Sequence, residues 1–297
     1  MRIAIASGKG GTGKTTIAVS LFLTLAEQTV HGSDAVCQLL DCDVEEPNAA
    51  IFAKPVIEGS EEVGIRLPEV DFDLCTYCGR CAEVCAYHAI AVFGDQLLIF
   101  PQLCHGCGSC THNCPEGAIH EVLSPTGTLS WGTIREQPAL RFGQGEMIVG
   151  EAMATPIIRQ LKRKMRSVSR ESVTILDAPP GNACPVVETM RGADFALLVT
   201  EPTPFGLHDL RIAVDVASEE LGVPVGVVIN RDGVGDGSVD EFCAERGVPI
   251  LLRIPLDRRI AETYADGIPL VEALPEYRSE FADLYASVVA LIEGRDR

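Results

Sequence analysis

The sequence predicts an α/β protein with a doubly wound, mostly parallel sheet and one small inserted α+β domain. Three observations favour this class. The 297 residues are 46% hydrophobic but only 5% aromatic, and are rich in Val, Ile, Ala and Gly, which suits a buried parallel sheet. Short apolar runs alternate with helical stretches along most of the chain. Residues 64–122 interrupt this alternation and hold eight of the twelve cysteines.

The N-terminal part predicts a strand, a helix and a second strand. Residues 2–7 form an apolar run that ends in a glycine-rich turn. Ile17, Leu21 and Leu25 recur at helical spacing and predict a helix over 15–26. Residues 35–40 predict the next strand, which leads into an acidic turn.

The rest of the chain predicts an insert and then a return to the alternating pattern. We expect a main domain of 1–63 and 123–297 and an insert of 64–122, which is too short to bury much core of its own. Polar–apolar alternation predicts strands within 127–149, and 155–165 reads as a helix. Further buried strands, separated by helices, are predicted at 173–176, 196–199, 225–229 and 250–254, before a final amphipathic packing helix at 278–293.

Charge and composition exclude several classes of function. Lys and Arg number 24 against 42 Asp and Glu, giving a net charge of −18. This charge disfavours direct binding of nucleic acid or anionic lipid, because both bind to basic surface patches. No apolar run approaches the roughly 20 residues that cross a bilayer, so we expect no transmembrane segment. Many cysteines without an export signal indicate a reducing cytoplasm.

Two copies of one cysteine pattern, C-x2-C-x2-C-x3-C, lie in the insert. The repeat continues past the thiols, since Ala89-Ile90 follows the first copy at the offset where Ala118-Ile119 follows the second. This spacing resembles that of bacterial two-cluster ferredoxins, in which the fourth cysteine of each run ligates the other cluster. The pattern therefore predicts two [4Fe-4S] clusters, one held by Cys75, Cys78, Cys81 and Cys114, and the other by Cys104, Cys107, Cys110 and Cys85.

Zinc and disulfide bonds are the alternatives for these thiols. Zinc takes four ligands per site and has no need of an eight-cysteine interlock. A disulfide framework belongs to oxidising compartments. One departure from the ferredoxin pattern is that Ala86 follows Cys85, whereas Pro115 follows Cys114. A proline at this place shapes the turn and does not bind iron.

A phosphate-binding loop of the form G-x4-G-K-[ST] lies between the first strand and the first helix. Its glycines let backbone N–H groups turn toward phosphate oxygens, and the N-terminus of the following helix adds its dipole. We expect Lys14 to reach the β- and γ-phosphates of ATP or ADP and the Thr15 hydroxyl to ligate Mg²⁺. The expected nucleotide-binding residues are Gly8, Lys9, Gly10, Gly11, Thr12, Gly13, Lys14, Thr15 and Thr16.

The early lysine makes the loop more specific. The form K-G-G-T-G-K-T-T over 9–16 resembles the deviant Walker A motif of the MinD/ParA/Mrp superfamily of P-loop ATPases, to which nitrogenase iron protein is related. The resemblance implies an ATP-sandwich dimer in which Lys9 contacts the partner's nucleotide phosphate and is catalytic together with Lys14. The dimer could pair two copies or this chain with a related ATPase. A solvated loop lysine is the alternative for Lys9.

Other motifs of that superfamily follow in sequence order. Asp41-Cys42-Asp43 resembles its first switch, which implies that Asp43 positions or deprotonates the attacking water and that Asp41 supports the Mg²⁺ shell. Residues 177–181 (D-A-P-P-G) resemble Walker B and the second switch, which places Asp177 near the metal. The adenine-binding residues implied by the resemblance are Asn230, Pro255 and Asp257.

Weaker signals concern single residues. Cys184, seven residues after Asp177, could bind a bridging metal at a dimer axis, but free cysteine commonly behaves as a small hydrophobe, so we expect it to be buried, as we do Cys42 and Cys243. His105, inside the second cysteine run, either tunes a cluster or lies exposed. The basic residues Lys162, Arg163, Lys164 and Arg166 predict a solvated helix face.

Together, the motifs imply a slow, partner-stimulated ATPase with an inserted ferredoxin domain, and three hypotheses for its role. The first is nucleotide-gated electron transfer from a protein donor to a protein partner or its metallocofactor. The second is a carrier or scaffold for iron–sulfur or metallocofactor assembly, as in the Mrp branch. The third is a positioning ATPase of the MinD/ParA kind with a redox-sensing insert. The sequence does not name the donor, the acceptor or the process.

Overall fold

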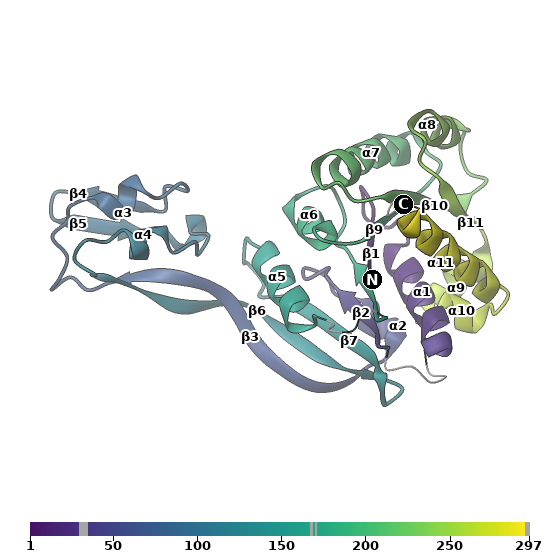
Figure 1. Ribbon diagram of the computed structural model, residues 1–297, viewed down its shortest axis with the longest axis horizontal. Coiled ribbons are helices and arrows are strands. Elements are labelled where there is room, and N and C mark those ends of the chain that lie inside the picture. Colours follow the sequence, from purple (N-terminus) through teal and green to yellow (C-terminus); the bar gives the residue numbers. More distant parts are fainter. Residues whose placement is uncertain (30–34, 167–168, 170, 295–297) are drawn as a thin grey trace.

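The computed structural model describes residues 1–29, 35–166, 169 and 171–294. Its main body is one nine-stranded sheet in the order β11-β10-β9-β1-β8-β2-β7-β6-β3 (Figure 1). The strands from β11 to β7 are parallel, and β6 and β3 are antiparallel additions at one edge. The predicted α/β class and its mostly parallel sheet are confirmed.

The central strands are buried on both faces. β1 (Arg2–Ala6), β2 (Cys37–Asp41), β8 (Val173–Asp177) and β9 (Phe195–Thr200) consist almost wholly of buried residues, because helices cover both sides of a parallel sheet. The outer parallel strands are β10 (Val225–Asp232), β11 (Ile250–Pro255) and β7 (Gln137–Met147).

Helices form a layer on each face of the sheet, as in a doubly wound fold. One core contains residues of α1 (Lys14–Thr29), α2 (Ala49–Ala53), α10 (Leu270–Ala273) and α11 (Tyr277–Glu293). The other contains residues of α5 (Thr155–Lys164), α6 (Cys184–Met190), α7 (Pro204–Asp215) with its π-helical extension Val216–Glu220, and α8 (Ser238–Arg246). The short, exposed α9 (Arg258–Ala265) follows β11. The final helix packs by Phe281, Leu284 and Val288, which confirms the packing role expected for it.

A long antiparallel ribbon carries the insert away from the sheet. β3 (Val56–Val70) and β6 (Ile119–Ile134) pair along their whole length, and in Figure 1 they run from the main body to the separate small unit. We call this ribbon the arm. The expected boundaries at 63/64 and 122/123 fall inside the arm, so the compact part of the insert spans about residues 71–118.

The insert is a two-fold repeat of short elements with a very small core. α3 (Arg80–Glu83) corresponds to α4 (Ser109–His112), and the hairpin β4 (Ile90–Phe93) and β5 (Gln96–Ile99) lies between the copies, followed by the 3₁₀ turn Pro101–Leu103. Its buried apolar cluster contains only Cys81, Ile90, Leu97 and Ile119. So small a core cannot stabilise a domain by itself.

Candidate nucleotide and cysteine sites

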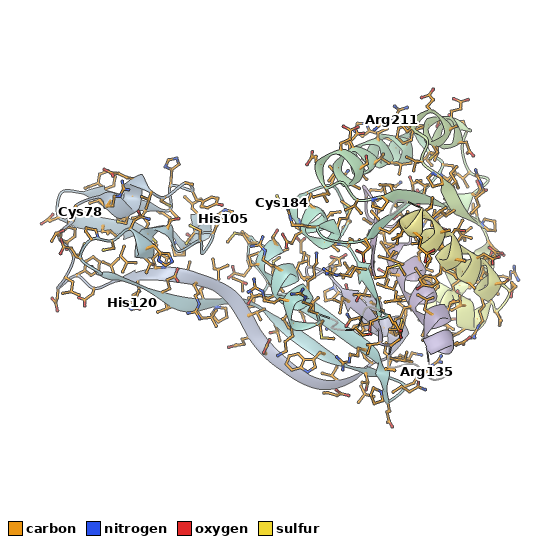
Figure 2. The ribbon with its side chains drawn as sticks, in the orientation of Figure 1. Cys78, His105, His120, Arg135, Cys184 and Arg211 are labelled. Atoms are coloured by element: carbon orange, nitrogen blue, oxygen red, sulfur yellow. The ribbon has the colours of Figure 1, made fainter. Side chains whose placement is uncertain are left out.

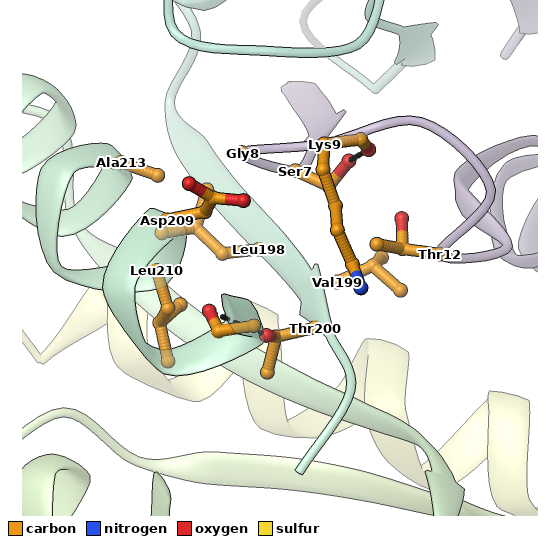
Figure 3. Close-up of a pocket in the computed structure, with 11 residues that line it drawn as sticks. Ser7, Gly8, Lys9, Thr12, Leu198, Val199, Thr200, Asp209, Leu210 and Ala213 are labelled. Atoms are coloured by element: carbon orange, nitrogen blue, oxygen red, sulfur yellow. Dashed lines mark hydrogen bonds between the residues drawn. The ribbon is translucent and has the colours of Figure 1, made fainter. Parts of the chain in front are cut away.

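The phosphate-binding loop joins the end of β1 to the start of α1, as expected. Gly11 and Gly13 adopt positive φ, which a side chain disfavours. Gly8 is required by close approach, since a Cβ there would lie 2.3 Å from Cβ of Asp209 on α7. A small pocket lies between this loop and α7. Figure 3 shows Asp209 facing Gly8 across it, and the Ser7 hydroxyl donates to the Lys9 carbonyl at 2.6 Å.

Lys14 lies in a partly acidic environment at the first turn of α1. Its side chain is almost fully buried, and burial lowers the pKa of the ammonium although Asp177 and Asp43 oppose this shift. The structure thus brings together three residues expected at the phosphate and metal positions. The buried lysine ammonium is suited to binding phosphate oxygens. The two carboxylates are suited to a magnesium ion, whose positive charge would balance theirs and that of the phosphate.

Asp177, at the end of β8, supplies the clearest test of a metal site. Burial raises the pKa of this carboxyl to about 7, with Thr15 and Lys14 offsetting part of the rise. By strict hydrogen-bond geometry neither carboxylate oxygen of Asp177 has a partner among the described residues, so Thr15 approaches it without satisfying it. A buried carboxylate without a donor beside a threonine hydroxyl fits Mg²⁺, which takes few protein ligands and completes its shell with water and phosphate.

Asp41 and Asp43 differ in burial and in their hydrogen bonds. Asp41 is fully buried, and its oxygens accept the backbone N–H groups of Asp43, Asn48 and Ala49 at 2.9–3.1 Å. Burial, and then the charge of Asp177, raises the pKa of Asp41. Asp41 therefore fixes the loop 43–48, which we call the switch segment, while its part in the Mg²⁺ shell stays a prediction. Burial raises the pKa of Asp43 to about 6, although Lys14 and a backbone N–H lower it.

Lys9 makes an ion pair within its own chain. Its ammonium lies 2.9 Å from Glu201, whose other oxygen lies 2.5 Å from the Arg231 guanidinium. Arg231 also donates to the Gly11 carbonyl at 3.2 Å, and Asn230 donates to the Thr12 carbonyl at 2.7 Å. Sequence reasoning missed the roles of Glu201 and Arg231, because no local motif marks an ion pair between residues 9 and 201.

Of the three residues expected beside adenine, Asn230 lies in β10, and the other two lie where β11 leads into α9. Pro255 ends the strand, and Asp257 caps the helix by accepting the Arg259 backbone N–H at 2.8 Å. Its Oδ2 is also paired with the Arg259 guanidinium at 2.7 Å. Their contact with a nucleotide base stays a prediction.

The cysteines of the insert line two separate hollows. The first thiol site consists of Cys75, Cys78, Cys81 and Cys114, and the second thiol site consists of Cys85, Cys104, Cys107 and Cys110. These are the two interlocked sets expected from the spacing, because each hollow takes three thiols from one copy of the repeat and one from the other. Among the described residues, no three Cys, His, Asp or Glu side chains converge as they would on a single metal ion.

The backbone of each copy presents its thiols in the same way. Ala89 donates its N–H to Cys85 Sγ at 3.2 Å, and Ala118 donates to Cys114 Sγ at 3.3 Å, four residues after the cysteine in both copies. Gly79 and Gly108 cap the two short helices with positive φ. The internal repeat is therefore conformational as well as sequential.

Comparison with known proteins identifies the nucleotide-binding part. Residues 3–270 match the CobQ/CobB/MinD/ParA nucleotide-binding domain family. The chain belongs to this family. The family is described as a nucleotide-binding domain, and the matched residues include the loop where Lys14 and Thr15 lie. None of the helices that the structure describes is long and apolar enough to cross a membrane.

Individual relatives cover nearly the whole chain. It is 32% identical over 278 residues, 90% of each protein, to the uncharacterized protein MJ0579 of Methanocaldococcus jannaschii. It is 25% identical over 287 residues to an iron-sulfur cluster carrier protein of Pyrococcus abyssi, covering 91% of this chain and 79% of that protein. The septum site-determining protein MinD of Pyrococcus horikoshii, complexed with Mg-ADP, superposes with a TM-score of 0.55 at 19% identity, covering 97% of this chain and 95% of MinD.

Two expectations about single residues of this CobQ/CobB/MinD/ParA protein were wrong. Cys184 is exposed, because it begins α6 directly after the loop that follows Asp177 (Figure 2). Lys162 does not belong to a solvated helix face, because its ammonium donates to the carbonyls of Glu188, Thr189 and Arg191 at the end of α6. Cys42 and Cys243 are buried, as expected.

Proposed function

We propose that this protein is an ATP-dependent iron–sulfur protein that acts in the assembly or delivery of iron–sulfur clusters or a related metallocofactor. The observation that carries the proposal is that eight thiols, divided four and four between two hollows, share one chain with a P-loop nucleotide site. The alignment of 91% of this chain with an iron-sulfur cluster carrier protein supports the same role.

The donor set of the insert fits two [4Fe-4S] clusters. Each hollow is lined by four thiols, and thiolates are the ligands that such clusters require. A zinc site takes four ligands and has no need of eight thiols shared between two copies of a repeat. When bound, the clusters supply one-electron chemistry.

The residues around the phosphate-binding loop suit ATP hydrolysis. Lys14 and the backbone N–H groups of the loop would hold the phosphates, while Thr15 and Asp177 would hold Mg²⁺, Asp177 directly or through water. Asp43, whose pKa of about 6 lies near neutrality, would orient the attacking water and accept its proton. We expect Lys9 to leave Glu201 and contact the nucleotide of a partner in an ATP-dependent dimer, either of two copies or with a related ATPase.

A chain of hydrogen bonds links the nucleotide site to the arm. Asp41 holds the switch segment, whose Val44 carbonyl accepts the Met147 N–H at 2.7 Å from the end of β7. The next residue, Ile148, donates to the Thr126 carbonyl at 2.9 Å in β6. A movement of the switch segment on binding or hydrolysis of ATP would therefore act on β6, which leads directly into the insert.

Nucleotide-gated electron transfer to a protein partner is the second candidate, because the thiol sites are interlocked. Cys85 and Cys114 each cross to the other site, so neither cluster could leave without loosening both copies of the repeat. Retained clusters are suited to passing electrons, whereas a carrier needs at least one labile cluster. Likeness to MinD at 19% identity concerns the fold alone and adds nothing to a positioning role.

One experiment separates the candidates. Anaerobic protein carrying ⁵⁵Fe-labelled clusters is incubated with a small apo-ferredoxin and Mg-ATP, with Mg-ADP and Lys14→Ala as controls. Iron that reaches the acceptor only with Mg-ATP supports the assembly function. Iron that stays on the protein, together with ATP-dependent reduction of an oxidised ferredoxin, supports electron transfer. If wild-type protein shows neither iron transfer nor ferredoxin reduction, both candidate functions are overturned.

A further inference from the structure

The two thiol sites are matched in exposure, so solvent access does not distinguish them. Each site has one exposed, one buried and two partly buried cysteines. The repeat also matches their backbone, since positive φ recurs at Tyr77 and Gly106 and again at His88 and Gly117. Differences between the sites are therefore sought in the hydrogen-bond donors and charges that surround each set of thiols.

Two equivalent positions of the repeat differ in hydrogen-bond donors. Ser109, two residues after Cys107, places its hydroxyl 3.5 Å from the Cys107 sulfur. Its counterpart two residues after Cys78 is Arg80, which pairs with Glu83 at 3.1 Å and makes no contact with a thiol in the described structure. At this position the second site has a hydroxyl, which accepts from the Cys107 thiol and is free to donate once the sulfur is a thiolate. The first site has its hydroxyl at a different position, on Thr76, which follows Cys75 and lines that hollow.

The second difference lies one residue beyond the third cysteine of each run. Thr111 follows Cys110, and its hydroxyl is buried with no partner of ordinary geometry among the described residues. Ala82 follows Cys81 in the first copy and has no hydroxyl. The Thr111 hydroxyl lies near enough to the Cys110 sulfur to oppose the rise in that thiol's pKa that burial causes. It is therefore a donor available to the Cys110 thiolate, at a position where the first copy has none.

Nearby charges also differ between the sites. Arg66 and Glu121 both line the second site, and the charge of Glu121 acts on the Cys104 and Cys107 thiols, so the hydrogen-bond donors there have to outweigh it. Glu116 lines the first site, which has no lining cation among the described residues. The backbone adds a further donor to the second site, because Gly106 donates to Cys104 Sγ at 3.4 Å.

We propose that Ser109 and Thr111 give the second thiol site the higher reduction potential, so that an electron entering the insert comes to rest there. Reduction adds negative charge to a cluster, and donors to its sulfur ligands stabilise that charge. One electron leaves the reduced first cluster and reduces the second, and no bond or proton changes. The original electron comes from a one-electron donor protein. This inference rests on the proposed function, since it requires both clusters.

The arrangement gives the electron a direction within the molecule. In Figure 2, Cys78 of the first site lies at the end of the insert far from the main body, while His105, beside Cys104 of the second site, lies at the end that faces it. The second site also packs on the arm, since Gly106 approaches the Arg66 backbone. With the higher potential at the second site, electrons would move toward the nucleotide-binding body.

The test is an anaerobic redox titration of the loaded protein, followed by absorption and electron paramagnetic resonance. Wild-type protein should show two one-electron steps. In the double variant Ser109→Ala with Thr111→Val, the higher step should fall by about 59 mV, a tenfold change in the electron's distribution, while the lower step stays fixed. The reciprocal variant Arg80→Ser with Ala82→Thr should raise the lower step, and Arg80→Ala serves as the matched control that adds no hydroxyl.

The outcomes separate this inference from the proposed function. Fewer than eight irons per wild-type chain would contradict the proposed function itself. Eight irons with one unresolved potential, or with a higher step that the double variant leaves in place, would overturn the inference alone. If the double variant fails to hold its clusters, the single variant Ser109→Ala and the reciprocal variant test the inference instead. A higher step that Ser109→Ala leaves in place, or a lower step that the reciprocal variant does not raise, would overturn it.

Discussion

Lys14, Asp43 and Asp177 form a charge-coupled group at the scale of single residues. The ammonium is the nearby cation that offsets the two carboxylates, and burial affects all three. Each charge is therefore set by the others, and a substitution at one changes the protonation of its neighbours. The oxygens of Asp177 have no hydrogen-bond donor of good geometry among the described residues, which is why we propose this carboxylate for Mg²⁺.

Replacing Lys14 by Ala should weaken Mg-ATP binding about 100-fold, because loss of one partner from a buried charge pair costs about 3 kcal/mol. Isothermal titration calorimetry measures the affinity. Iron content should stay unchanged, because the thiol sites lie in the insert. The paired control is Lys164→Ala, an exposed lysine whose partners are Glu61 and Trp131 and which should bind Mg-ATP normally. Equal affinities of the two variants would contradict the role of Lys14.

The nucleotide-free protein should lose stability as the pH rises through about 6 to 7. Burial raises the pKa of Asp43 to about 6 and of Asp177 to about 7 from an ordinary 3.8, so the folded state binds protons that the unfolded chain releases. The stability due to the protonated forms is fully present below pH 3.8 and is lost above these values. Between pH 5.5 and 8 the free energy of unfolding should fall by about 3 kcal/mol.

Urea unfolding at several pH values measures this dependence. Asp177→Asn should remove most of the slope, because Asp177 has the higher pKa and titrates across most of the range. Asp71→Asn is the control, an exposed carboxylate in the insert that should leave the slope unchanged. An undiminished slope in Asp177→Asn would show that other groups cause it.

At the scale of elements, α6 is held by a lysine from another helix. The ammonium of Lys162 on α5 donates to three carbonyls at the end of α6, satisfying acceptors that a helix leaves unpaired. Burial lowers the pKa of this ammonium, and the nearby Glu188 opposes the shift. This contact fixes the helix that begins with Cys184 and follows the loop after Asp177.

Lys162→Met should therefore destabilise the fold by about 2 kcal/mol, because it keeps the apolar stem but leaves these carbonyls without their donor. Arg163→Met on the same helix is the control, because Arg163 is exposed and its replacement should change stability by less than about 0.5 kcal/mol. Chemical unfolding measures both. Equal effects would mean that Lys162 contributes no more than a surface residue.

At the scale of the whole molecule, the arm connects the two sites. β6 accepts a hydrogen bond from Ile148, beside the residue that binds the switch segment, and continues into the thiol-bearing insert. Gly64 and Gly132 on the arm are required by close approach, because a Cβ at either position would lie 1.9 Å from a carbonyl oxygen of the paired strand. The arm is thus a closely paired β-ribbon and not an unstructured linker.

The reduction potentials of the clusters should therefore depend on the bound nucleotide. Coupling of about 1–3 kcal/mol corresponds to a shift of roughly 40–130 mV between Mg-ADP and a non-hydrolysable Mg-ATP analogue. Anaerobic titration in each state measures it. Lys14→Ala should abolish the shift without lowering iron content. Fixed potentials in wild-type protein would mean that ATP controls docking or dimerisation instead.

The sequence itself determined much of the fold and the placement of the sites. Regular alternation of apolar runs and helices predicts the parallel sheet, because a strand buried on both faces must be apolar throughout. The cysteine spacing predicts which thiols meet, because three ligands on one tight loop leave only the distant fourth to be shared. The phosphate-binding motif of residues 8–16 likewise spans the turn after β1 and the first turn of α1, because its glycines form the turn and the residues after them form the helix.

Only the tertiary structure decided contacts between residues far apart in the chain. Lys9 with Glu201, Lys162 with the end of α6, and the exposure of Cys184 have no local pattern, because each depends on how two helices or loops meet across the sheet. The arm was equally hidden, since β3 and β6 pair over residues separated by the whole insert. Local sequence determines the secondary structure of each segment, and long-range packing determines which side chains contact one another.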